Sequence, residues 1–276
     1  MSQIKVNLIK YSESTETKKR LATFSIQIPK FIWGHMISHR ALSRNSASSR
    51  AIPAKRIRYK VIHNPFMPVY FGENQPGMKS GSPIHGVRLV LANKFWRWSR
   101  WIPVFFHYLS EKVGVHKEVI NRLIEPWLLV DVIVTATEWN NFISLRMNND
   151  AQPEIREVAS QINNLLKSQN PDILNVGEWH LPFIMDNENS LDIEAKKKIS
   201  AARCARVSYS LFNGKVSDLE SDIRLCEKLS SSGHWSPFEH IATPSKKIDR
   251  FGNFIGWMQY RKEFESENGG DYSTLH

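Results

Sequence analysis

Cysteine is scarce in this chain of 276 residues, which has only Cys204 and Cys226. The two do not form a C-x-x-C pair, and they are too few for the disulfide framework that staples small secreted domains. This scarcity excludes a disulfide scaffold and favours a reducing compartment.

Long apolar stretches are also absent. Residues 1–10 alternate apolar and polar side chains, without the apolar core of a signal peptide. The longest apolar run, Trp127–Ala136, contains Asp131 and is too short to span a bilayer. We therefore expect a soluble, cytoplasmic protein that does not contact a membrane.

Acidic residues are nearly missing from residues 50–100, which carry ten Lys or Arg against the single acid Glu73. This region should attract an anion: nucleotide phosphates, nucleic acid or an acidic partner. Within it, residues 94–101 interleave tryptophan with cations, as single-strand binders do. The same spacing occurs on half-buried helices and at subunit contacts, and we favour that interpretation.

The hydrophobic content of 41% suffices for a sizeable core. The irregular connection from Ser168 to Asp192 contains an apolar stretch, Trp179–Met185, that a linker between independent domains would lack. We expect residues 1–276 to form a single domain.

Hydrophobic spacing predicts several elements. Alternation predicts strands over residues 3–9 and just before Pro29, and the apolar pattern predicts a helix over Phe31–Leu42. Two segments are expected to be core: the helical stripe of Val115, Val119 and Leu123, and the apolar run that starts at Trp127 and continues through Val134. Another helix is predicted by apolar residues that repeat at helical intervals, Ile155, Val158, Ile162 and Leu165.

Helix signals frame the later segments. Asp150 is a candidate N-cap and Pro153 a first-turn residue. Residues 217–220 fit a capping box for a helix lined by Leu219, Ile223, Cys226 and Leu229 and ended by Gly233. His234 should then lie on a loop just beyond that helix.

A first polar set lies in residues 35–50. His35 and His39 are four residues apart, but Met36 stands where a zinc-protease helix needs Glu, so we expect no metal site. Arginine forks with hydroxyl and carboxamide groups suit an anion and its neighbouring oxygens. These groups are Arg40, Ser43, Asn45, Ser48 and Arg50.

A second polar set lies in residues 145–156. If Pro153 starts a helix, its free N–H groups face the same space as Gln152 and Arg156. Capping explains Asp150 and Pro153, but it does not require Arg146 and Arg156. This set also suits an anion or an ionised heterocycle.

Four blocks resemble the signatures of the flavin-dependent thymidylate synthases, the ThyX family. Residues 38–50 resemble R-H-R-x-x-S-x-N-E-x-S-x-R, and residues 145–156 resemble L-R-x-x-x-x-A-Q-x-E-I-R. Residues 205–209 are similar to A-R-V-S-Y and residues 234–240 to H-x-S-P-F-E-H. The family usually places the last two blocks first, so this chain resembles a circularly permuted member, which is physically acceptable where the old termini lie close together.

The resemblance implies an α+β fold with a central antiparallel sheet flanked by helices, with the motif order circularly permuted. It implies an FAD-dependent thymidylate synthase-like methyltransferase that converts dUMP to dTMP. A methylene group would come from methylene-tetrahydrofolate and reducing equivalents from NADPH through FAD. It also implies a homotetramer with shared active sites, with the Trp-rich segment 95–101 as one candidate contact.

The same resemblance assigns site residues by position. Flavin contacts fall on Ser38, His39, Arg40, Asn45, Arg146, Asp150, His234 and Ser236. The dUMP contacts fall on Arg40, Ser48, Arg50, Gln152 and Arg156. Arg156 and Ser48 are the catalytic candidates, and Arg156 would stabilise negative charge on the uracil ring. No enzymic thiol is needed, so both cysteines are expected in the core.

Two positions depart from the family pattern: Ser38 replaces its first Arg, and Ser46 replaces its Glu. Residues 254–262 echo residues 31–39, and we hypothesise that Arg261 fills the place of the missing Arg and binds substrate. The altered charges leave two other functions open. One is dUMP modification ending in a different group such as hydroxymethyl, and the other, which we favour least, is a non-catalytic basic nucleic-acid-binding relative.

Overall fold

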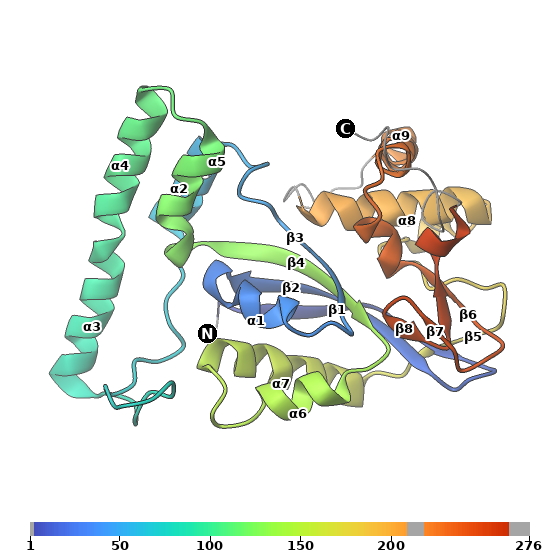
Figure 1. Cartoon of the computed structure of the whole chain (residues 1–276), viewed down its shortest axis with the longest axis horizontal. Coiled ribbons are helices and arrows are strands. Elements are labelled where there is room, and N and C mark those ends of the chain that lie inside the picture. The colour runs from blue at the N-terminus through green and yellow to red at the C-terminus, as the bar shows by residue number, and fades with distance from the viewer. Residues whose placement is uncertain (1–2, 209–217, 265–276) are drawn as a thin grey trace.

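The computed structural model describes residues 3–208 and 218–264, and its centre is a five-stranded sheet in the order β3-β4-β2-β1-β5 (Figure 1). The strands are β1 (Lys5–Ser14), β2 (Arg20–Pro29), β3 (Ser43–Ser46), β4 (Leu129–Ala136) and β5 (Asp172–Leu174). The pairs β1–β2, β2–β4 and β3–β4 are antiparallel, whereas β1 and β5 pair in parallel. The expected antiparallel sheet is therefore confirmed except at this edge.

Helices flank the sheet, as expected. They are α1 (Trp33–Ile37), α2 (Ala54–His63), α3 (Gly86–Ser99), α4 (Trp101–Lys112), α5 (Lys117–Ile120), α6 (Asn140–Arg146), α7 (Pro153–Ser168), α8 (Ile193–Ser208) and α9 (Leu219–Ser231). Turns of 3₁₀ helix are η1 (Lys30–Ile32), η2 (Asn121–Trp127), η3 (Asp186–Glu188), η4 (Ser236–His240) and η5 (Tyr260–Glu263). None of the helices within the described ranges has the length and apolar character of a membrane span.

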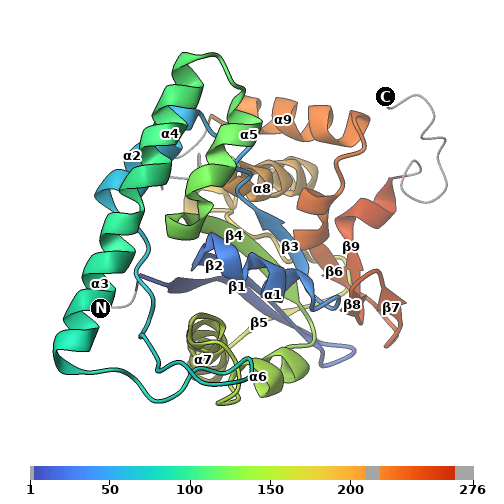
Figure 2. The same cartoon turned by 60° about the vertical axis from the view of Figure 1, so that its left-hand side comes forward.

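Small ladders complete the C-terminal part of the fold. Strand β6 (Ala242–Pro244) pairs with β9 (Trp257–Gln259), and β7 (Arg250–Phe251) pairs with β8 (Phe254–Ile255). This region lies at the opposite end of the sheet from α3 and α4 (Figures 1 and 2).

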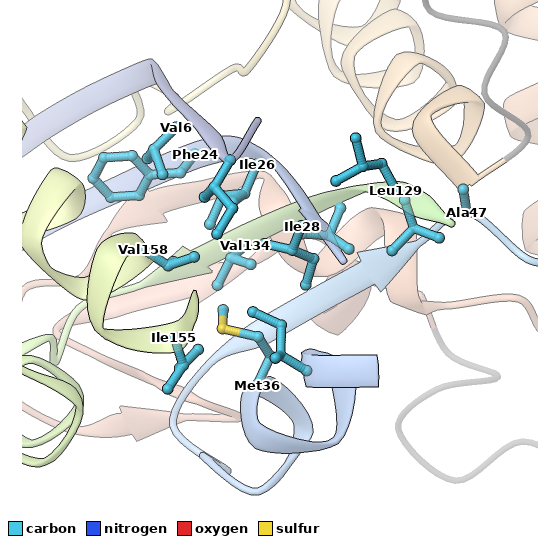
Figure 3. Close-up of a cluster of buried hydrophobic side chains, with 14 of the residues drawn as sticks. Val6, Phe24, Ile26, Ile28, Met36, Ala47, Leu129, Val134, Ile155 and Val158 are labelled. Atoms are coloured by element: carbon cyan, nitrogen blue, oxygen red, sulfur yellow. The ribbon is translucent and has the colours of Figure 1, made fainter. Parts of the chain in front are cut away.

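Strand β4 is buried on both faces. Val134 shares a hydrophobic cluster with Ile155 of α7 (Figure 3), whereas Ile133 packs with Cys204 of α8. A strand covered on both faces needs a nearly continuous apolar sequence, because successive side chains point to opposite sides. The expectation that Trp127–Ala136 belongs to the core is confirmed.

Helix α7 follows its sequence pattern. Pro153 occupies the first helical turn, and Ile155, Val158 and Ile162 are fully buried against the sheet. Leu165 is half-buried and packs against the same cluster. This helix fixes the position of the second polar set at its N-terminus.

The first predicted helix is shorter than expected. Helix α1 ends at Ile37 instead of continuing to Leu42. The Arg44 guanidinium donates to the carbonyls of Ile37 at 2.9 Å and Leu42 at 2.5 Å, and pairing with β4 begins at Ser43. Strand pairing with a distant segment therefore ends the helix, and residues 38–42 form a turn.

The stripe of Val115, Val119 and Leu123 is not core, so this prediction was wrong. These side chains are 41%, 62% and 44% exposed. A turn with positive φ at Gly114 precedes the short helix α5, and a 3₁₀ helix follows it, so the helical period is not maintained. Ile120 is instead the buried apolar residue of α5.

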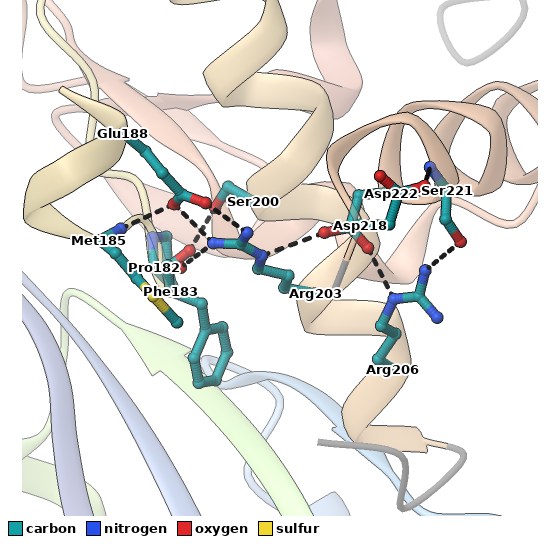
Figure 4. A network of polar contacts seen from close by, with 10 residues as sticks. All are labelled: Pro182, Phe183, Met185, Glu188, Ser200, Arg203, Arg206, Asp218, Ser221 and Asp222. Atoms are coloured by element: carbon teal, nitrogen blue, oxygen red, sulfur yellow. Dashed lines mark hydrogen bonds and ion pairs between the residues drawn. The ribbon is translucent and has the colours of Figure 1, made fainter. Parts of the chain in front are cut away.

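Helices α8 and α9 are joined by a buried ionic network around Arg203 (Figure 4). Its guanidinium donates to both Glu188 oxygens at 2.6 and 2.7 Å and to Asp222 at 3.1 Å. Arg206 donates to the other Asp222 oxygen at 2.7 Å. Arg203 lowers the pKa of the Glu188 carboxyl by hydrogen bonding. Three loop and helix segments are thereby fixed to one another.

The end signals of α9 are confirmed in part. Asp218 is the N-cap and accepts from the Ser221 amide at 3.1 Å, while Ser217, proposed to open the capping box, lies outside the described residues. Gly233 has a φ of +68° just after the helix, as its stop signal predicts. Cys204 and Cys226 are free and buried, as expected.

A chain of buried polar side chains ties the C-terminal region to the sheet. Ser12 Oγ contacts His180 Nδ1 at 2.9 Å, and His180 Nε2 contacts Thr23 Oγ1 at 2.8 Å. Thr23 contacts Thr135 at 2.7 Å, and Thr135 contacts His240 Nδ1 at 2.8 Å. All five residues are fully buried. This chain holds η4 against β2 and β4.

Candidate functional site

Arg146 unites the first and second polar sets. At the end of α6, its Nε donates to His39 Nε2 at 2.8 Å and its Nη2 donates to Ser38 Oγ at 3.1 Å. Since a guanidinium only donates, His39 Nε2 accepts and the imidazole is neutral. Burial and, secondarily, the Arg146 charge lower the pKa of His39.

Ser38 has a clear role in this cluster. Its hydroxyl accepts from Arg146 and donates to the His35 carbonyl at 2.8 Å. An arginine at position 38 would place a second cation beside Arg146. Arg146 is the guanidinium that reaches Ser38, whereas Arg261, which was hypothesised to fill this place, pairs with Glu239.

A cavity of about 510 Å³ lies beside this cluster. Its polar lining comes from the turn after α1 and from the segment entering α6. The lining includes Ser38, His39, Arg40, Glu138, Asn141 and Arg146. The structure thus places the flavin candidates Ser38, His39, Arg40 and Arg146 around one cavity.

A second cavity, of about 840 Å³, opens at the N-terminus of α7. Asp150 and Gln152 line it together with His35 and Arg146, so Arg146 borders both cavities. Burial and the Arg146 charge also lower the pKa of His35. Two imidazoles and one guanidinium therefore lie at this border.

Asp150 is not an N-cap, which corrects the prediction. Gln152 is the N-cap of α7, and its side chain makes no cap hydrogen bond. Asp150 instead forms an ion pair with Lys79 at 2.8 Å, and hydrogen bonding to Lys79 lowers the pKa of its carboxyl. The carboxylate is exposed and faces a loop that the sequence motifs did not include.

That loop, residues 68–84, forms the other wall of the larger cavity. Tyr70, Phe71, Gly72, Met78, Lys79 and Ser80 line it. The loop folds back on itself through hydrogen bonds from the Glu73 amide to the Ser82 carbonyl and from the Ile84 amide to the Phe71 carbonyl. A Cβ at Gly72 would lie 2.5 Å from Ser80 Oγ, so only glycine fits this close approach.

Sequence reasoning missed this wall because the loop has no periodicity and no motif that points to α7. The only signal was its position within the basic region that follows Arg50. The Val69 amide donates to Glu154 Oε1 at 3.1 Å, and Glu154 is buried. This contact fixes the loop to the first turn of α7.

The substrate candidates Ser48 and Arg50 lie elsewhere. They follow the opposite end of β3 from His39, and Arg50 pairs with Glu118 of α5 at 3.2 Å. Neither lines the two cavities described above. Within a single copy of the chain, these two candidates therefore lie apart from the Arg146 cluster.

Arg156 lies in the first turn of α7 but outside the lining of both cavities. Its Nη1 donates to Asn149 Oδ1 at 3.3 Å, in the loop before the helix. It therefore lies near Asp150 and Gln152 in the chain, with its guanidinium turned toward the loop.

The C-terminal candidates form a third group. His234 is exposed and contacts Ser232 Oγ at 2.9 Å, Ser236 is exposed at the start of η4, and Arg261 pairs with Glu239. Asn45 is buried in β3 and its Nδ2 atom has no hydrogen-bond partner within residues 3–208 and 218–264. A buried amide without a partner among the protein groups is unusual.

Known proteins resemble the part of the chain that contains these elements. The family model "Thymidylate synthase complementing protein" matches residues 4–172, more than half of the chain. A flavin-dependent thymidylate synthase from Thermotoga neapolitana is 40% identical over 77 residues, which are 28% of this chain and 34% of that protein. The chain thus spans about a third of the length of this curated relative.

A solved structure shows the same fold. The UMP/dUMP methylase PolB from Streptomyces cacaoi, bound with 5-Br UMP, superposes with a TM-score of 0.50 at 16% sequence identity. The superposition covers 60% of this chain and 89% of PolB. The matched residues 4–172 contain β1 to β4, the Arg146 cluster and the N-terminus of α7. The chain therefore belongs to the thymidylate synthase complementing protein family.

Proposed function

We propose that the protein is a flavin-dependent enzyme that converts dUMP to dTMP, with methylene-tetrahydrofolate as methylene donor and NADPH as reductant. Family membership supports the class of enzyme, and the Thermotoga relative is described as a flavin-dependent thymidylate synthase. The observation that carries the proposal is Arg146, which binds His39 and Ser38 and borders two cavities.

The residues present fit a flavin dinucleotide. Its diphosphate needs cationic donors, which Arg40 and Arg146 supply, and His39 can donate from Nδ1 because its Nε2 accepts from Arg146. Both cavities are in the size range of cofactor sites. The bound flavin would supply the transfer of reducing equivalents. Asp150, Asn45, His234 and Ser236 are the other proposed contacts.

The proposed dUMP contacts are Arg40, Ser48, Arg50, Gln152, Arg156 and Arg261. Gln152, at the N-terminus of α7, presents an amide to the larger cavity, where free backbone N–H groups favour negative charge. Arg156 would stabilise negative charge on the uracil ring, and Ser48 is proposed as the second catalytic residue.

We further propose a homotetramer with active sites shared between copies. Within a single copy of the chain, Ser48 and Arg50 lie apart from the Arg146 cluster. This separation supports a site that a second copy completes. Helices α3 and α4 form an arm away from the sheet (Figure 2), with an exposed apolar face. Trp98, Ile102 and Phe105 are 61%, 68% and 56% exposed. Such a group of exposed apolar side chains is typical of a protein–protein contact.

We expect Ile102→Glu to reduce the molar mass of the assembly in light scattering, because the new carboxylate would be buried at the contact. Ile248→Glu is the control, since Ile248 is similarly exposed at 63% but lies outside the arm. An Ile102→Glu protein that keeps the wild-type mass would show that the arm is not the contact.

The circular permutation and the single domain are also proposals. Residues 205–208 and 236–240 of the C-terminal motifs lie in α8 and η4, and both elements pack against β3 in the matched region. This packing allows the late blocks to share one site and one core with the early blocks.

Two measurements test the proposed activity. Purified protein should show flavin absorbance, and a colourless protein that takes up no added FAD would favour a nucleic-acid-binding role. Mass analysis of dUMP after incubation with methylene-tetrahydrofolate and NADPH should show a methyl group. A hydroxymethyl product would instead support the alternative that Ser38 and Ser46 left open.

Arg156→Ala should retain flavin but lose turnover by about 100-fold or more, because an oxyanion-stabilising donor is removed. Absorbance gives the flavin content and single-turnover assays give the rate. Lys167→Ala is a matched control, since Lys167 is an exposed cation at the other end of α7. Full activity of Arg156→Ala would refute the proposed role.

A further inference from the structure

We propose that Asn121 is a positioning residue for the turn of residues 48–52, which carries Ser48 and Arg50. This inference rests on the proposed function, which places dUMP at these two side chains. Asn121 lies at the start of η2, more than 65 residues away in sequence, and is fully buried. Neither the motifs nor the family pattern singled it out.

The Asn121 amide holds the turn at both ends. Its Nδ2 donates to the Ser49 carbonyl at 2.7 Å and to the Ile52 carbonyl at 3.2 Å. Each carbonyl would lose a buried donor without it, and an unpaired buried carbonyl is costly. One side chain therefore sets the spacing between the two backbone positions that flank Arg50.

The orientation of the Asn121 amide is set from the helical arm. Arg58 Nη1 lies 3.0 Å from His107 Nδ1, and His107 Nε2 lies 3.0 Å from Asn121 Oδ1. Because the guanidinium can only donate, Nδ1 accepts and the Nε2–H group donates to Asn121 Oδ1. Both Nδ2 hydrogens are then free for the turn. A relay from α2 through α4 to η2 thus determines the geometry of the turn.

Further contacts fix the same turn to the same elements. Lys117 Nζ donates to the Ala51 carbonyl at 3.0 Å, and Ser49 Oγ donates to Glu125 Oε1 at 2.8 Å. Arg50 pairs with Glu118 of α5. Residues 48–52 directly follow β3 of the sheet, but α5 and η2 hold them in place through residues 117–125.

Asn121→Ala tests the proposal in the full-length protein. We expect dUMP to bind about tenfold more weakly in calorimetry, while the flavin content and its spectrum stay at wild-type values. Amide hydrogen exchange at residues 49–52 should become faster without ligand. Asn93→Ala is the control, because the Asn93 amide donates to the Leu89 carbonyl of its own helix.

Asn121→Asp is the second variant, which keeps the side-chain volume and the acceptor for His107 but removes both donors to the turn. We expect the same weakening of dUMP binding. If both variants bind dUMP within about twofold of wild type, the positioning role is overturned. If wild-type protein binds flavin but no dUMP, the proposed function is overturned and the substrate role of this turn with it. The two failures are therefore distinguishable.

Discussion

We expect Arg203→Met to lower the free energy of unfolding by about 3–5 kcal/mol, because the change leaves buried carboxylates without their cation. Arg203 is fully buried, and its guanidinium bonds Glu188, Asp222 and the Phe183 carbonyl (Figure 4). Methionine has a similar length but offers no donor. The loss therefore comes from the uncompensated Glu188 and Asp222 charges more than from packing.

Urea unfolding followed by circular dichroism measures this effect. Arg224→Met is the matched control, because Arg224 pairs with Glu220 on the exposed face of α9 and such pairs contribute little. We expect that control to stay within about 0.5 kcal/mol of wild type. An Arg203→Met protein as stable as the control would contradict the importance of the network. A single transition in all three proteins would support one domain for residues 1–276.

Acid should destabilise the fold through the buried histidines. Burial lowers the pKa of His240 to about 3 and holds that of His180 well below its usual value. In the unfolded chain both would titrate near pH 6.5. Their contribution to stability is therefore complete above about pH 6.5 and declines as the pH falls toward the folded values. At pH 5 the expected loss from His240 is about 2 kcal/mol, and His180 adds to it in the same direction.

His240→Gln identifies the source of this pH dependence. Glutamine cannot be protonated, so the stability change between about pH 7.5 and pH 5 should be about 2 kcal/mol smaller in the variant than in wild type. His63→Gln is the control, because His63 is exposed at the end of α2. Equal pH dependence of the urea midpoint in wild type and His240→Gln would show that His240 does not titrate on unfolding.

Local patterns predicted the elements whose apolar faces meet one core. The stripe of α7 predicted a helix and the apolar run of β4 predicted a buried segment, because burial leaves an apolar pattern in the sequence, although that pattern did not identify β4 as a strand. Helix α1 was predicted too long, since β3 pairs with β4 from a distant part of the chain. Such pairing produces no pattern in the residues around α1 themselves.

The candidate site likewise has residues that motifs in the sequence identify and residues that only the fold brings together. The resemblance assigned His39 and Arg146 to one site, and a hydrogen bond joins the two side chains. The wall of residues 68–84 and the relay through Asn121 depend on contacts between segments without a motif. The residues involved, such as Lys79 and His107, gain their roles only from neighbours that the fold supplies.

The two thiols described in α8 and α9 give the protein an internal reporter. Burial raises the pKa of Cys204 and also that of Cys226, to about 12, so thiolate is scarce at both positions in the folded state. Alkylating reagents need thiolate and access, and both are scarce until α8 separates from β4, which exposes Cys204, or α9 separates from α8, which exposes Cys226. The rate at which iodoacetamide modifies the native protein would therefore measure how often this layer opens, separately from the arm and the cavities around Arg146.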